Sequence, residues 1–116
     1  MPTDVTFSRT RPSPRPTPLA DAAPTLRVLA DPVRAAILDL LAAEDLCVCH
    51  LQDELGIKQT LVSHHLRALR EAGLVESDPA GRFTYYRLSA GAIASVRDAV
   101  AGLAEACDAE RRRRPC

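Results

Sequence analysis

The cysteines are the residues of this sequence with the most distinctive chemistry. Two of the four stand close together, Cys47 and Cys49, and two lie toward the C-terminus, Cys107 and Cys116. Thiolates bind soft metal ions or form disulfides, and a neutral thiol packs as a small apolar group. The chain opens without the charged and apolar segments of a secretory leader, so we expect a cytoplasmic protein, in which structural disulfides are rare. Metal binding, redox sensing and packing are the roles left for these thiols.

The spacing of Cys47 and Cys49 sets a condition on their joint use. On an ideal helix, residues i and i+2 point about 200° apart, so two sulfurs placed there cannot reach one ion. They converge only if the chain around Val48 is extended or frayed. Both fall at the start of a short helix expected over residues 46–55, where fraying costs little and the helix dipole favours a thiolate. An ion bound here would therefore pull on the beginning of that helix.

Length and composition predict one globular domain. The 116 residues carry equal numbers of basic and acidic side chains, and 47% are apolar, which is enough for a single core. The longest apolar runs are far too short for a membrane span. We divide the chain into a disordered Pro- and Arg-rich tail at 1–18, an ordered domain at 19–112, and a flexible tail with a terminal cysteine at 113–116.

Hydrophobic periodicity predicts a mainly α-helical domain with one β-hairpin. Asp31 is expected to cap a helix with Pro32 at its first position, and Gly56 and Gly73 are expected to end two other helices. The expected helices cover residues 19–30, 33–43, 46–55, 58–72 and 90–112, and the expected hairpin has strands at 74–77 and 83–88 joined by a turn at 78–81.

Two helices joined around Gly56 and followed by a hairpin have the order of a winged helix-turn-helix, whose second helix enters the major groove of double-stranded DNA. That helix has an apolar inward face and a polar outward face. Its polar residue types bond base edges and phosphates, although an ordinary solvent-exposed face has a similar composition. Of the adjacent His64 and His65, we expect one to face DNA and the other to pack. The candidate DNA contacts are Gln59, Thr60, Ser63, His64 and Arg67 on the helix and Arg82 beside the hairpin turn.

The last expected helix carries an apolar stripe with heptad-like spacing of 3, 4, 3 and 4 residues. This spacing suits pairing with another helix, and Cys107 could simply pack within it. The stripe consists of Ile93, Val96, Val100, Leu103 and Cys107.

Four segments resemble the ArsR/SmtB family of bacterial metal-responsive repressors. They begin at Leu29 (LADPVR), Leu46 (LCVCHL), Leu61 (LVSHHL) and Arg70 (REAGLV), and the resemblance spans about residues 24–104. The Leu-Cys-Val-Cys segment is similar to the thiolate box of the family's arsenical, cadmium and lead sensors. The resemblance implies a homodimer formed through the first and last helices, which binds operator DNA and releases it when metal binds.

The resemblance also shows where this chain departs from the arsenical sensors. Their third box cysteine corresponds to Gln52 here, and His50 stands where the family often has Asp. As(III) or Sb(III), the most favoured effectors, take three thiolates, whereas Cd(II), Pb(II) or Zn(II) take three or four ligands. We expect the third ligand to be Cys107, or else Cys116, from the same subunit or from its partner.

Two other functions are consistent with the same residues. A disulfide from Cys107 to Cys47 or Cys49 would make a redox or sulfur-species sensor, and a winged helix that no longer binds DNA could sequester metal or dock a protein. The family's zinc site on the last helix is not expected, because residues 90–112 contain no histidine. Phosphate loops and nucleophile elbows are also lacking, so we expect no enzyme.

Overall fold

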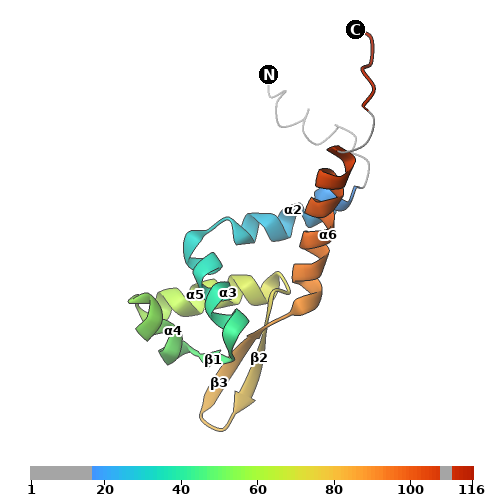
Figure 1. The fold of residues 1–116 in the computed structure, drawn as a ribbon. Helices are drawn as coiled ribbons and strands as arrows, with labels where there is room; N and C mark the ends of the chain where they lie inside the picture. The colour runs from blue at the N-terminus through green and yellow to red at the C-terminus, as the bar shows by residue number, and fades with distance from the viewer. Residues whose placement is uncertain (1–16, 108–110) are drawn as a thin grey trace, which may run out of the picture.

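The structure is a computed structural model that describes residues 17–107 and 111–116. Figure 1 shows a helical body from which a β-hairpin extends on one side and the end of the last helix on the other. The elements are α2 (Pro18–Leu29), α3 (Pro32–Ala43), β1 (Leu46–Cys47), α4 (Val48–Leu55), α5 (Gln59–Glu71), β2 (Val75–Ala80), β3 (Phe83–Leu88) and α6 (Ala90–Cys107). Within the described residues, no helix combines the length and apolarity needed to cross a membrane.

The first two helices are capped by side chains. The Thr17 hydroxyl accepts a hydrogen bond from the Ala20 N–H, and the Asp31 carboxylate accepts hydrogen bonds from the Val33 and Arg34 N–H groups at 2.8 and 3.1 Å. These bonds satisfy backbone donors that have no partner inside the helix. The predicted cap at Asp31 is confirmed. Of the tail predicted at 1–18, residues 1–16 lie outside the described residues, whereas Pro18 is already the first residue of α2, so the boundary predicted at 18/19 lies too late.

The start of the next helix differs from the prediction. Residues 46–47 were expected to be helical, but they form β1 and pair with β3 in the register Leu46↔Tyr86 and Cys47↔Tyr85. Pairing with the hairpin satisfies the backbone of this segment, so α4 begins only at Val48. The predicted helix end at Gly56 is confirmed, with φ at 68°, a value that favours glycine.

The hairpin is longer than predicted, and the sheet has three strands in the order β1-β3-β2. Asp78 to Ala80, expected in the turn, continue β2 and pair with β3 as far as Ala80↔Phe83. The turn is therefore the pair Gly81 and Arg82, with Gly81 supplying the positive φ of 64°. Arg87 of β3 reinforces the longer ladder through its 3.0 Å bond to the Asp78 carboxylate.

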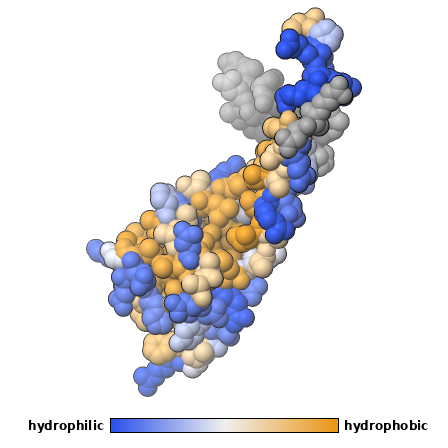
Figure 2. Space-filling view, viewed as in Figure 1, coloured by the Kyte–Doolittle hydropathy of each residue, from blue (hydrophilic) through white to orange (hydrophobic). Residues whose placement is uncertain are grey.

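The core lies where α3, α4 and α5 meet the hairpin, and the predicted inward face of α5 is confirmed. Figure 2 shows apolar surface gathered on the body of the molecule, whereas the protruding segment 111–116 is mostly hydrophilic. The most deeply buried large side chains are Ile37, Leu51, Val62, Leu66, Leu69 and Leu74.

The last helix ends earlier than predicted. The described part of α6 runs to Cys107, residues 108–110 lie outside the described residues, and Arg111 and Arg112, expected to be helical, lie in neither helix nor strand. Four successive arginines repel one another, which disfavours a helix. Ile93 packs against the core, but Val100 and Leu103 are 47% and 51% exposed in the single chain. The distal half of the apolar stripe is therefore available for a second helix.

A buried histidine of α5 joins that helix to α3. The Arg34 Nε–H donates to Nδ1 of His65 at 3.1 Å, and the His65 side chain is almost fully covered. Burial lowers the pKa of His65 below its usual value; the Asp31 carboxylate opposes this shift, and the nearby Arg34 charge adds to it. The neutral imidazole is therefore the form that fits the fold.

Acidification should weaken the fold through His65. Below about pH 6.5 the imidazole of His65 is protonated in the unfolded chain, whereas in the folded chain it stays neutral to a lower pH. The contribution of His65 to the free energy of unfolding should therefore be complete above that pH. At lower pH the free energy of unfolding should decrease, by at most about 1.4 kcal/mol per pH unit from this group. Urea unfolding between pH 7 and 5 measures the slope. His65→Asn keeps an uncharged acceptor and should flatten it, whereas His64→Asn on the surface should not. Equal slopes for His65→Asn and the wild type would contradict this assignment.

Candidate metal centre and DNA-reading surface

Cys47 and Cys49 meet at the junction between β1 and α4. Cys47 has extended backbone angles, φ −97° and ψ 173°, and stands immediately before the first helical residue. Its Sγ lies 2.9 Å from the Sγ of Cys49. The condition set by the spacing, an extended chain beside Val48, is therefore met. Cys47 is buried and Cys49 is exposed, so one sulfur is anchored while the other is free to turn.

His50 adds a nitrogen atom that could bind a metal, a ligand that the sequence did not predict. Its Nδ1 accepts the Cys47 backbone N–H at 3.2 Å and lies 3.3 Å from the Cys47 Sγ. Suitable ligand atoms of Cys47, Cys49 and His50 all lie within 4.8 Å of one another. The sequence feature that could have identified His50 is its position three residues after Cys47. At this spacing the side chain of the third helical residue can reach back to the backbone N–H of the residue that caps the helix.

The two thiols differ in acidity. Burial raises the pKa of Cys47, but hydrogen bonds from the Cys49 thiol and from backbone N–H groups, including that of His50, outweigh burial, so its pKa lies below the usual value. The pKa of Cys49 is raised, first by its hydrogen bond to Cys47 and then by burial. Cys47 is therefore the thiol that loses its proton more readily, with the Cys49 S–H as a donor to its sulfur, and a thiolate is the form that binds metal.

The other two cysteines stand apart from this pair within the chain. Cys107 is the last residue of α6, and Figure 1 shows that end of the helix on the opposite side of the molecule from α4. Cys116 lies beyond it, and both side chains are exposed. Among the described residues, the donors that converge are Cys47, Cys49 and His50.

The thiols open onto a hollow that they share with two of the predicted DNA contacts. The hollow has a volume of about 340 Å³ and lies between the start of α4, the start of α5 and the hairpin. Gln59 comes from the first turn of α5, and Arg82 from the hairpin turn. Phe83, beside Arg82, also lines it and is 56% exposed. The thiols therefore share one hollow with a residue of α5 and with the turn of the hairpin.

The predicted DNA contacts lie on the surface. All six predicted side chains are exposed, five along α5 and Arg82 at the tip of the hairpin. His64 is exposed and His65 is buried, as expected of one histidine facing outward and one packing. The set is Gln59, Thr60, Ser63, His64, Arg67 and Arg82.

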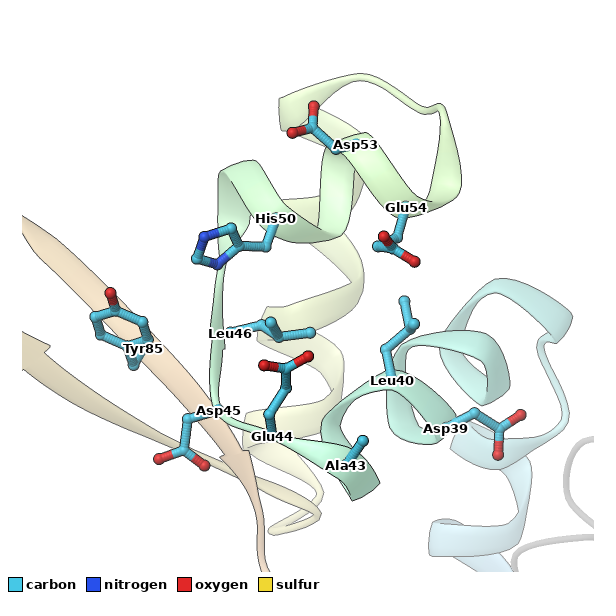
Figure 3. A pocket seen from close by; sticks show the side chains of 10 residues that line it. All are labelled: Asp39, Leu40, Ala43, Glu44, Asp45, Leu46, His50, Asp53, Glu54 and Tyr85. Carbon is cyan, nitrogen blue, oxygen red and sulfur yellow. The ribbon is translucent and has the colours of Figure 1, made fainter.

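A second hollow, beside α3 and α4, has the opposite character. Figure 3 shows carboxylates around it, with His50 on the first turn of α4 and Tyr85 on β3 at the same side. This concentration of acidic groups repels phosphates, so DNA is not expected on this side. The carboxylates are those of Asp39, Glu44, Asp45, Asp53 and Glu54.

Comparison with known proteins decides the family. The sequence pattern described as "Bacterial regulatory protein, arsR family" matches residues 31–77. The HTH-type transcriptional repressor SmtB of Mycobacterium tuberculosis is 45% identical over 98 residues, which cover 83% of this chain and 73% of that protein. The chain belongs to the ArsR family. As a member of this family of transcriptional regulators, it is a DNA-binding protein and not an enzyme.

Two further relatives of this ArsR-family protein carry arsenic in their names. The arsenic resistance transcriptional regulator ArsR1 of Pseudomonas putida is 44% identical over 63 residues, 53% of this chain and 49% of that protein. The crystal structure of a possible transcriptional regulator for arsenical resistance is 33% identical with a TM-score of 0.63, covering 74% of this chain and 96% of that one. The likeness of fold confirms the predicted winged helix-turn-helix.

Proposed function

We propose that this ArsR-family protein is a repressor that leaves operator DNA when a soft metal or metalloid ion binds Cys47 and Cys49. The observation that carries the proposal is the convergence of the two sulfurs, 2.9 Å apart, in the hollow that also holds Gln59 and Arg82. Thiolate pairs favour soft ions. SmtB and ArsR1 are named as a repressor and as an arsenic resistance regulator, which supports an ion as the signal.

The proposed coupling runs through the segment that carries Cys47. Cys47 pairs with Tyr85 of β3 on one side and begins α4 on the other. An ion that binds both Cys47 and Cys49 acts on both attachments, and so on the placement of the hairpin, the wing of this fold, relative to the helix pair α4 and α5. Linkage makes the effect reciprocal, since bound operator must lower ion affinity by the same factor as the ion lowers operator affinity.

The proposed repressor is a homodimer in which α2 and α6 form the interface. α2 and α6 pack against each other within the chain, and the exposed Val100 and Leu103 extend that apolar surface. A twofold dimer would place two copies of α5 in successive major grooves. Sedimentation of the ion-free protein tests this state.

The nature of the ion depends on the third ligand. As(III) or Sb(III) would need a third sulfur, and Cys107 or Cys116 would have to bring it from a second subunit or after a rearrangement of the chain. Cd(II) and Pb(II) are the alternatives within the same proposal. A redox sensor using a Cys107 disulfide needs the same rearrangement, because Cys107 ends α6 far from α4 in Figure 1.

A DNA-binding titration tests the proposal. The protein should shift DNA taken from upstream of its own gene, and at least one of arsenite, antimonite, Cd(II) and Pb(II) should release that DNA. Release by peroxide or polysulfide alone, with two thiols lost per subunit, would replace the ion by a redox signal. Tight ion binding without any DNA shift would instead indicate a metal-sequestering module.

A further inference from the structure

We propose that His50 is the third ligand of the thiolate site, so that one chain supplies two sulfurs and one nitrogen to the ion. The assignment rests on the proposed function, because it concerns the same site. The assignment supplies a third ligand from the same chain, which neither Cys107 nor Cys116 does. It also identifies the class of ion. A set of two thiolates and an imidazole suits a thiophilic divalent cation, Cd(II) or Zn(II), whereas As(III) prefers three sulfurs.

The distances fit a single tetrahedral ion after one small movement. With Zn–S bonds of about 2.3 Å and Zn–N bonds of about 2.1 Å, sulfur and nitrogen ligands lie about 3.6 Å apart and two sulfurs about 3.8 Å apart. The Cys47 Sγ lies 3.3 Å from His50 Nδ1, close to that spacing. The two sulfurs, at 2.9 Å, must separate. Cys49 is exposed and can turn outward without disturbing the core.

Coordination by His50 has a consequence for the helix. Its Nδ1 has one lone pair, which now accepts the Cys47 backbone N–H at 3.2 Å. An ion bound through Nδ1 takes that lone pair, and the Cys47 N–H loses its acceptor. Ion binding and capping of α4 therefore compete for one atom. Filling the site loosens the first turn of α4, which directly precedes α5, the helix with most of the predicted DNA contacts, and this gives the signal a direct path to DNA docking.

Variants at His50 separate the ligand from the cap. Glutamine at this position can still accept the Cys47 N–H, as in an ordinary capping box, but its amide is a poor ligand for a soft ion. Alanine removes both functions. His50→Cys restores a third donor as sulfur and should move the preference from Cd(II) toward arsenite. His64→Gln, an exposed histidine on α5, is the matched control for Cd(II) affinity measured without DNA.

The test is a Cd(II) titration of the full chain against a competing chelator, followed through the sulfur-to-cadmium absorption band. His50→Gln should lower Cd(II) affinity by roughly 10- to 100-fold or more, the range seen when groups around a metal are removed, and His64→Gln should not. X-ray absorption of the loaded wild type should show two sulfurs and an imidazole, the latter missing in His50→Gln. Unchanged affinity in His50→Gln, or three sulfurs in the wild type, would overturn the assignment. A wild type that shows no Cd(II) absorption band, and from which none of arsenite, antimonite and Pb(II) releases operator DNA, would overturn the proposed function itself.

Discussion

Cys49→Ser should leave ion-free operator binding unchanged and remove the release of DNA by soft ions. The Cys49 side chain is exposed at the junction of β1 and α4, so the substitution removes a thiolate with little disturbance of the core. Coupling between effector and DNA is commonly about 5- to 150-fold in affinity, and the variant should lose nearly all of it. Fluorescence anisotropy with labelled operator, titrated with Cd(II) and with arsenite, measures both quantities.

Cys47→Ser should lose the response equally, and the distal cysteines supply the controls. Cys47 is buried, so its variant needs a thermal unfolding curve beside the DNA titration to show that it is folded. Cys107→Ser and Cys116→Ser should retain release by Cd(II). Loss of the arsenite response alone in Cys107→Ser would assign the third sulfur of an arsenic site to that residue. Full release of DNA from Cys49→Ser would place the effector site elsewhere.

The sequence predicts the helical part of the fold well, because side-chain burial follows local periodicity. Val62, Leu66 and Leu69 recur on one face of α5, and all three are buried. Asp31 before Pro32 marks a helix start, because its carboxylate binds backbone N–H groups only two and three residues further along the chain. Both signals are complete within one turn of helix, so no knowledge of distant residues is needed.

The parts that the sequence did not predict depend on contacts between distant segments. Leu46 and Cys47 pair with Tyr86 and Tyr85, which follow much later in the chain, so no local pattern distinguishes this strand from a first helical turn. The proposed role of His50 as a metal ligand depends on the same pairing. Only when Cys47 is extended does its N–H reach the imidazole, and only then do the two sulfurs converge.

Arg67→Ala and Arg82→Ala should each weaken operator binding while leaving the fold intact. Arg67 is exposed on α5 and Arg82 on the hairpin turn. A lost phosphate contact lowers the salt dependence of binding by about 0.9 in the log–log slope, whereas a lost base contact costs about 1–3 kcal/mol and relaxes sequence preference. Anisotropy at several salt concentrations separates the two. Arg97→Ala on α6, exposed and bonded to Asp98, is the control and should change neither.

Arg82 offers the sharper of the two tests, because it lies in the hollow that the thiols share. If the wing carries the ion signal, Arg82→Ala should reduce both operator affinity and the additional loss of affinity caused by Cd(II), since the contact that the ion disturbs has already been removed. Arg67→Ala removes a contact outside that hollow and should lower operator affinity. The Cd(II) factor, meaning the ratio of operator affinity without Cd(II) to that with Cd(II), should stay unchanged. An unchanged Cd(II) factor in both variants would place the coupling in the start of α4 rather than in the wing.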